Sequence, residues 1–91
     1  MSSEDLDMRF AQAAEDVTKL PEAPDNTIML QLYGLFKQAT KGDCDGKRPG
    51  ILDLIGRAKY DSWAENKGTP QETAKEKYIA LVAELKSNVG K

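Results

Sequence analysis

The chain has 91 residues, a net charge of −2 and an isoelectric point near 5.1. This length supports one small hydrophobic core, so we expect a single domain over residues 1–91. The acidic balance argues against a nucleic-acid-binding protein, which normally carries a basic surface. The chain has no histidine and only one cysteine, Cys44. It therefore lacks the commonest metal ligand and cannot form an intrachain disulfide, and we expect no metal site.

Targeting and membrane signals also narrow the possibilities. No apolar run approaches the roughly 18 residues of a membrane span, and the acidic N-terminus lacks the basic and apolar regions of a signal peptide. We therefore expect a cytoplasmic protein without stable membrane insertion. Three function classes remain for a module of this size: a small-molecule carrier, a protein-interaction module and an enzyme.

Two amphipathic helices are predicted in the first half of the chain. From about residue 3 to residue 20, apolar positions recur at the three- and four-residue spacing of one helix face: Leu6, Phe10, Ala13, Ala14, Val17 and Leu20. Pro21 ends this helix, and Asp25 or Asn26 can cap a second helix that extends to about Lys41. The second helix has more apolar residues than one buried face needs, which indicates a ligand groove or a central place in the core: Met29, Leu30, Leu32, Tyr33, Leu35 and Phe36.

A long loop and two further helices are predicted in the second half. Residues 42–50 are rich in Gly, Asp, Lys and Pro and are expected to form the loop. A third helix is expected from about Asp53 to Asn66. Thr69 then precedes a proline and, three residues on, a glutamate, which is a typical capped helix start. The fourth helix is expected to reach about Val89.

These segments predict an all-α protein built as a four-helix bundle. The long connection lets helices 2 and 3 run parallel, whereas shorter connections favour antiparallel neighbours. On the second helix, Tyr33 and Lys37 are four residues apart and share one face. A ring offers a stacking surface and a lysine offers charge for a phosphate, so this pair suits a flat phosphorylated ligand. Trp63, on the third helix, is expected in the core.

Two blocks of sequence carry a distinctive pattern. In the first, Tyr-x-x-aromatic-Lys-Gln-Ala-Thr at residues 33–40 precedes a Gly-Asp turn and an Arg-Pro-Gly run. In the second, residues 58–61 read Ala-Lys-aromatic-Asp and are followed by Trp63 and a Lys-Gly pair. Together the blocks closely resemble the signature of the acyl-CoA-binding protein family, also called diazepam-binding inhibitor. The resemblance extends from Phe10 to Leu85.

The resemblance implies both a fold and a function. The family folds as four helices in an up-down-down-up arrangement that forms a shallow bowl. The acyl tail lies in the bowl, the CoA head group covers the opening, and basic residues hold the 3′-phosphate. The resemblance thus implies a non-catalytic intracellular carrier that binds long-chain fatty acyl-CoA thioesters and needs no cofactor. We expect a monomer, because ligand can cover the apolar groove in place of a partner.

The family pattern also implies which residues bind the ligand. The family's adenine and phosphate positions on the second helix match these residues of the chain: Met29, Leu30, Tyr33, Phe36 and Lys37. Lys59 matches a second phosphate-binding lysine on the third helix, and Tyr78 matches a tyrosine on the fourth that contacts the ligand. Thr18 and Ile55 stand where lysine is frequent, so the basic cluster is expected to be thinner than usual. Phe36 stands where tyrosine is frequent, so stacking is expected to survive with the loss of one hydroxyl contact. The full set of expected ligand-binding residues is Thr18, Met29, Leu30, Tyr33, Gly34, Leu35, Phe36, Lys37, Ile55, Lys59 and Tyr78.

Two alternatives to the carrier can be weighed from the residues. A helical interaction module that recognises an amphipathic partner helix would explain the apolar excess, but it gives Lys37 and Lys59 no role. A thioesterase would have no histidine as its base. Cys44 lies between Asp43 and Asp45, whose carboxylates disfavour the thiolate form. We therefore expect no enzymatic activity.

Overall fold

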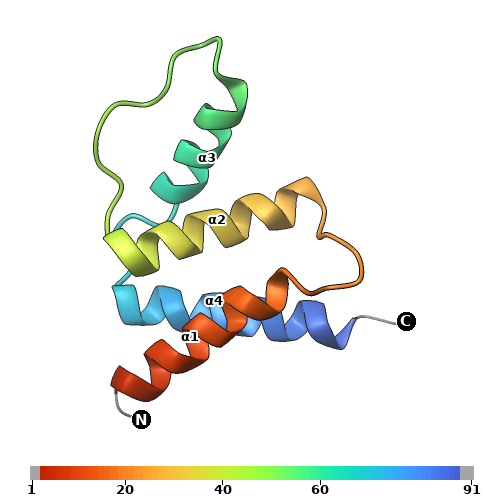
Figure 1. Ribbon diagram of the computed structural model, residues 1–91. Helices are drawn as coiled ribbons and strands as arrows, with labels where there is room; N and C mark the ends of the chain where they lie inside the picture. Colours follow the sequence, from red (N-terminus) through yellow and green to blue (C-terminus); the bar gives the residue numbers. More distant parts are fainter. Residues whose placement is uncertain (1–2, 89–91) are drawn as a thin grey trace.

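The structure is a computed structural model that describes residues 3–88. In this range the chain forms four α-helices (Figure 1): α1 (Ser3–Val17), α2 (Asn26–Lys41), α3 (Leu54–Ala64) and α4 (Gln71–Ser87). The all-α prediction is confirmed, and the longest connection, residues 42–53, joins α2 to α3 as expected. The predicted end of the fourth helix at Val89 lies outside the described residues.

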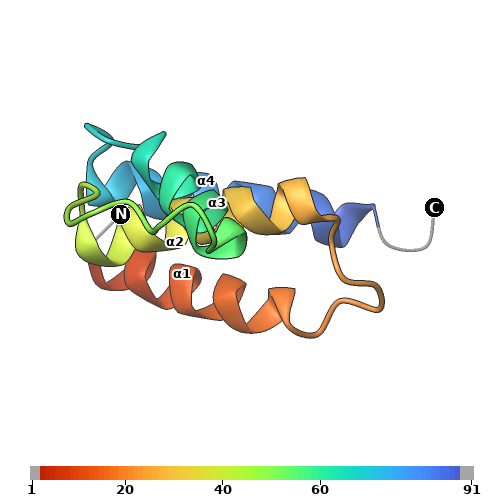
Figure 2. The ribbon, with the colours of Figure 1, turned by 90° about the horizontal axis from the view of Figure 1, so that it is seen from above.

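The helices follow the predicted up-down-down-up order. In Figure 1, α1 and α4 run in one general direction, α2 runs back against both, and α3 follows the direction of α2 while crossing it obliquely. α4 packs against α1 and α2, and α3 packs against α2. Figure 2 shows α1 in a layer of its own, with residues 18–25 crossing from that layer to α2. Among residues 3–88, no helix is long and apolar enough to cross a bilayer.

The core forms where α4 meets α1 and α2. Its side chains recur at helical spacing on the three facing surfaces: Phe10, Ala13, Leu32, Leu35, Ala39, Ala74, Tyr78 and Val82. Trp63 is also buried, and its indole Nε1 donates a hydrogen bond of 2.8 Å to the carbonyl oxygen of Gly42. The prediction that Trp63 is a core residue is therefore confirmed, and its ring ties α3 to the end of α2.

Local hydrogen bonds determine where the first two helices end and begin. α1 ends at Val17, three residues before the end of the apolar pattern, because the Thr18 amide and hydroxyl both donate to the Glu15 carbonyl, at 3.1 and 2.7 Å. Such bonds to the third residue back tighten the last turn and stop the helix. The carboxylate of Asp25 accepts a bond of 2.9 Å from the Ile28 amide, which makes Asp25 the cap of α2.

The start of α4 differs from the prediction. Pro70 occupies the cap position of α4, and no side chain there caps the helix. The prediction that Thr69 caps the helix was wrong, because its backbone serves a tertiary contact. Its carbonyl accepts a bond of 2.7 Å from Nε2 of Gln38, and its amide donates to the Asn66 carbonyl. α3 also ends early, at Ala64.

A buried amide anchors the long connection to the turn before α4. Gln38 is fully buried, and its Nε2 donates to Oδ1 of Asp43 at 2.9 Å. The same carboxylate oxygen accepts a bond of 2.8 Å from the Gly68 amide. These bonds, led by the one from Gly68, hold the pKa of Asp43 below its ordinary value. Residues 42–53 therefore leave α2 in a defined direction.

α2 and α3 approach each other closely at Gly34. A Cβ at this position would come within 2.7 Å of the Ser62 carbonyl carbon and 2.9 Å of Nδ2 of Asn66. Both distances are well inside the 3.5 to 4.0 Å of an ordinary carbon contact. The missing side chain thus allows α3 to pack directly on the backbone of α2.

Candidate functional site

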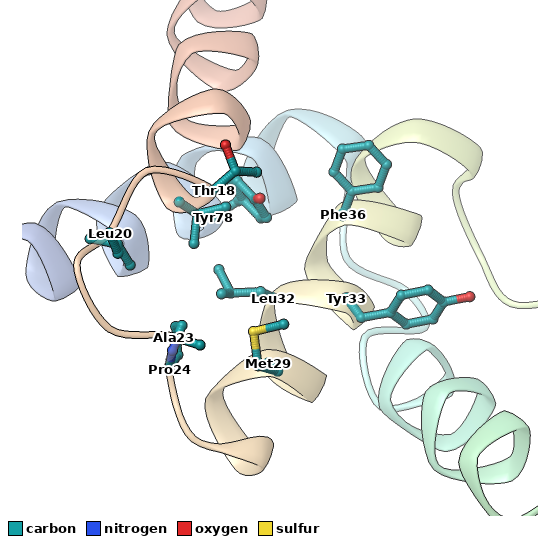
Figure 3. Close-up of a pocket in the computed structure, with 10 residues that line it drawn as sticks. Thr18, Leu20, Ala23, Pro24, Met29, Leu32, Tyr33, Phe36 and Tyr78 are labelled. Carbon is teal, nitrogen blue, oxygen red and sulfur yellow. The ribbon is translucent and has the colours of Figure 1, made fainter.

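An apolar pocket lies between α1 and α2 and is bordered by residues 18–25 (Figure 3). Its volume is about 410 Å³, which is within the usual range for small-molecule sites. Its lining residues come from the end of α1, the connection to α2, α2 itself and α4: Val17, Thr18, Leu20, Ala23, Pro24, Met29, Leu32, Tyr33, Phe36 and Tyr78.

The pocket follows from the way the helices pack. In residues 3–88, α1 and α2 both pack against α4 and make no close backbone contact with each other. The connection 18–25 spans the resulting opening, and Leu20, Ala23 and Pro24 contribute its wall. The Thr18 hydroxyl is already bonded to the Glu15 carbonyl of its own helix. This wall therefore presents mainly carbon atoms to the pocket.

Three aromatic rings pack together beside the pocket, and two of them, Phe36 and Tyr78, line it. The rings of Phe10 and Phe36 are stacked with centroids 5.5 Å apart, and Tyr78 meets Phe10 edge-on at 5.1 Å. Such ring pairs stabilise packing beyond the area they bury. Tyr78 is 4% exposed, and burial raises the pKa of its hydroxyl. Phe36 remains 39% exposed, so its ring has one face in the cluster and surface left for a ligand.

Tyr33 connects the pocket to α3. It lines the pocket, and in Figure 3 its ring points from α2 toward α3. The ammonium of Lys59 lies over the Tyr33 ring, 5.5 Å from its centroid. Lys59 is exposed, and Met29, on the α2 turn before Tyr33, is 48% exposed. The pocket rim therefore carries an aromatic face, a thioether and a solvated positive charge.

Lys37 lies in a different setting from Lys59. Its ammonium sits over the Trp63 ring, 4.7 Å from the centroid, at the contact between α2 and α3. Burial and the nearby charge of Lys41 lower the pKa of Lys37. A lysine held in this way keeps its stem against the protein and only its head in water. Lys37 is thus part of the α2–α3 surface, and it does not line the pocket.

The structure brings five of the eleven expected ligand-binding residues together in the pocket: Thr18, Met29, Tyr33, Phe36 and Tyr78. Gly34 and Leu35 are buried in the α2 packing, Leu30 is half-buried, and Ile55 is 72% exposed on the first turn of α3. Sequence reasoning did not name five other lining residues as site residues: Val17, Leu20, Ala23, Pro24 and Leu32. The apolar residues of the proline-rich connection were the signal that could have identified part of this wall.

The chemistry available in the pocket is that of binding. Among its lining residues, the side chains that carry a hydroxyl are those of Thr18, Tyr33 and Tyr78. Among residues 3–88, no group of three or more Cys, Asp or Glu side chains is placed to hold a metal ion. An apolar enclosure with hydroxyls and a lysine at the rim can hold an amphipathic molecule whose polar end stays near solvent.

The fold and the pocket define a small all-α domain with a ligand-sized apolar site. Residues 7–82 match the family model described as acyl CoA binding protein, and the chain belongs to this family. The chain is 45% identical to the acyl-CoA-binding protein homolog of Manduca sexta, over 93% of this chain and 96% of that protein. It is 47% identical to the homolog of Drosophila melanogaster, over 85% and 90% of the two chains. The crystal structure of Oryza sativa acyl-CoA-binding protein 2 has a TM-score of 0.93 and 38% identity, covering 98% of this chain and 97% of that one.

Proposed function

We propose that this chain is a non-catalytic carrier that binds long-chain fatty acyl-CoA thioesters. The observation that carries the proposal is the apolar pocket between α1 and α2, with Tyr33 at its rim and the Lys59 ammonium over that ring. A long acyl tail is stabilised by leaving water for an apolar enclosure, and a nucleotide is stabilised by a ring and a cation. The names of the relatives, which are acyl-CoA-binding proteins, support the same ligand.

In this proposal the two ends of the ligand use different residues. The acyl tail lies against Met29, Leu32 and Phe36 in the pocket. The head group lies across Tyr33 toward α3, where Lys59 and Lys37 supply positive charge for the phosphate. Leu30 and Ile55 border the head group, Thr18 and Tyr78 offer hydroxyls, and Gly34 and Leu35 shape the helix that carries these residues.

The proposal also covers the state of the protein and two activities that it lacks. The protein acts as a single-domain cytoplasmic monomer and does not bind nucleic acid, as its net charge of −2 supports. It has no thioesterase activity, because the chain lacks histidine and the pocket offers only hydroxyls. Incubation with an acyl-CoA should release no free CoA thiol above the rate in buffer, and catalytic thiol release would contradict this part.

Calorimetry with a long-chain acyl-CoA, free CoA and the free fatty acid tests the ligand assignment. The acyl-CoA should bind far more tightly than either half, since each buried methylene adds up to about 0.8 kcal/mol before ordering costs. Equal affinity for the fatty acid and its CoA ester would refute the proposal. Binding of an amphipathic helical peptide in place of acyl-CoA would favour an interaction module.

The phosphate role of the two lysines has its own test. Lys37→Ala and Lys59→Ala should each weaken acyl-CoA binding by about one to two powers of ten, as expected for loss of a charged hydrogen bond. Lys77→Ala removes an exposed lysine from α4 and is the matched control. A dephospho-CoA ester should bind the wild type more weakly and respond little to either variant. Equal losses of affinity for both ligands would show that these lysines do not bind the 3′-phosphate.

A further inference from the structure

The turn into α3 exposes apolar side chains that no part of the described fold covers. Ile51 and Leu52 are 74% and 97% exposed, and Leu54 and Ile55 are 73% and 72% exposed. Four such residues within five positions form a contiguous apolar patch, which soluble proteins rarely leave without a purpose. We call residues 51–55 the tip. In Figure 1 the tip lies at the end of α3 farthest from α1, where it projects from the other three helices.

The tip is held in place by polar contacts on both sides of it. The Tyr60 hydroxyl donates a bond of 3.0 Å to the Gly46 carbonyl. Arg48 makes a two-point ion pair with Asp61, with nitrogen–oxygen distances of 2.9 and 2.6 Å. These bonds join the residues before the tip to the middle of α3. The apolar residues are therefore displayed by an ordered turn and helix start.

Charge around the tip has the opposite sign from the charge of the whole chain. Residues 45–61 contain four basic and three acidic residues, a local net charge of +1, whereas the chain as a whole has a net charge of −2. Lys59 is four residues after Ile55 and shares its helix face. Lys47 is exposed on the other side of the tip, while Arg48 shares its charge with Asp61. An apolar tip is thus bordered by a local excess of positive charge.

The one carboxylate within the tip is turned back onto the helix. Oδ1 of Asp53 accepts a bond of 2.9 Å from the Gly56 amide and caps α3. The positive end of the helix dipole stabilises a carboxylate in this position. The negative charge of Asp53 is therefore partly offset within the chain, and the side chains that extend from the tip are apolar.

We propose that the tip docks the protein on the surface of an anionic lipid bilayer. Exposed apolar side chains enter the boundary between head groups and acyl chains, and the flanking lysines pair with anionic head groups. The inference goes beyond acyl-CoA binding, because Ile51, Leu52 and Leu54 lie outside the pocket and have no part in the proposed ligand site. The tip shares only Ile55 and the neighbouring Lys59 with the proposed head-group site. Docking of this kind requires only shallow insertion, consistent with helices in residues 3–88 that are not built to span a membrane.

Vesicle co-sedimentation of the ligand-free protein tests this inference. Wild type should bind vesicles of phosphatidylcholine mixed with phosphatidylserine and bind phosphatidylcholine vesicles much more weakly. The double variant Ile51→Asn/Leu52→Asn should lose about tenfold or more in affinity, since both side chains leave the apolar layer. Lys47→Gln should lose about fivefold. The matched control is Met8→Asn, which removes a 71% exposed apolar side chain from α1 and should bind like wild type.

A second readout detects insertion directly. In Leu52→Trp, the added indole should shift its emission to the blue on mixing with anionic vesicles. Absence of both vesicle binding and this shift would overturn the proposal, as would equal losses in the double variant and Met8→Asn. Wild-type self-association that the double variant abolishes would assign the tip to a second copy of the chain and also overturn it. Acyl-CoA calorimetry on the same variants separates the two functions: the double variant should keep wild-type affinity, and a parallel loss would assign the tip to the ligand site.

Discussion

Gly34→Ala tests whether the close approach of α2 to α3 determines the geometry of the site. The new Cβ would lie 2.7 Å from the Ser62 carbonyl carbon and closer still to its oxygen. Both atoms belong to the α3 backbone, so α3 must move by about 1 Å to restore an ordinary contact. Overpacking of this kind costs about 1 to 3 kcal/mol, whereas alanine in a helix gains about 1 kcal/mol over glycine.

The clash should exceed the helix gain. Because the clash is with backbone atoms that cannot rotate away, the upper end of the overpacking range applies. We expect Gly34→Ala to lower the free energy of unfolding by about 2 kcal/mol, which lowers Tm by about 8 to 16 °C for a domain of this size. The shift of α3 also moves Lys59 relative to Tyr33. Acyl-CoA affinity should therefore fall, while the weaker binding of the free fatty acid in the pocket should be unchanged. Thermal unfolding and calorimetry on the same samples measure both effects.

Gly56→Ala is the matched control on the neighbouring helix. A Cβ at Gly56 would also meet a close neighbour, but that neighbour is the side-chain carboxylate of Asp53, which can rotate away. The lost cap costs about 1 kcal/mol and the helix gain is about the same, so stability should change little. If Gly34→Ala is as stable as Gly56→Ala, the reasoning about close helix packing is refuted.

Three further substitutions examine single contacts. Asp43→Asn should weaken the acid sensitivity of the fold: because its pKa is lowered in the folded state, Asp43 contributes stability that is present above its unfolded pKa and lost as the pH falls below about 4. Urea unfolding between neutral and acid pH checks this, and parallel curves for variant and wild type would contradict it. Trp63→Phe leaves the Gly42 carbonyl without its 2.8 Å donor and should cost about 1 to 3 kcal/mol in denaturant unfolding; an unchanged midpoint would show that this bond stabilises nothing. Tyr78→Phe keeps the ring cluster and should leave Tm nearly unchanged while weakening acyl-CoA binding by about 0.5 to 1.5 kcal/mol; unchanged affinity would remove its hydroxyl from the ligand site.

The parts of the fold that depend on nearby residues could be predicted from the sequence. Apolar spacing identified four helices, and Asp25 was one of two proposed caps for α2. The start of α4, which was predicted wrongly, depends on a contact with a residue distant in the sequence. Thr69 has the sequence context of a cap, but its carbonyl bonds to Gln38, 31 residues away, and local sequence carries no information about that partner.

The pocket itself could be predicted only in part. The apolar excess on α2 indicated a groove, yet the same excess would suit a central core helix. α2 borders a groove because α1 and α2 both pack on α4 and leave space between them. Residues 18–25 span that space and form part of its wall. Residues such as Leu20 and Pro24 line the pocket because of where the chain crosses, and no periodic pattern distinguishes them from ordinary connection residues.

The lysine–ring contacts at the site lie between helices, although the sequence pattern pointed to two residues on one helix. Tyr33 and Lys37 do lie one turn apart on α2, as their spacing requires. Each nevertheless finds its partner on α3: Lys59 lies over Tyr33, and Lys37 lies over Trp63. The predicted pair within one helix is therefore replaced by two pairs between helices, and both depend on the backbone approach that Gly34 permits. Head-group affinity in this domain should accordingly respond to the spacing of α2 and α3 as well as to the identity of the lysines.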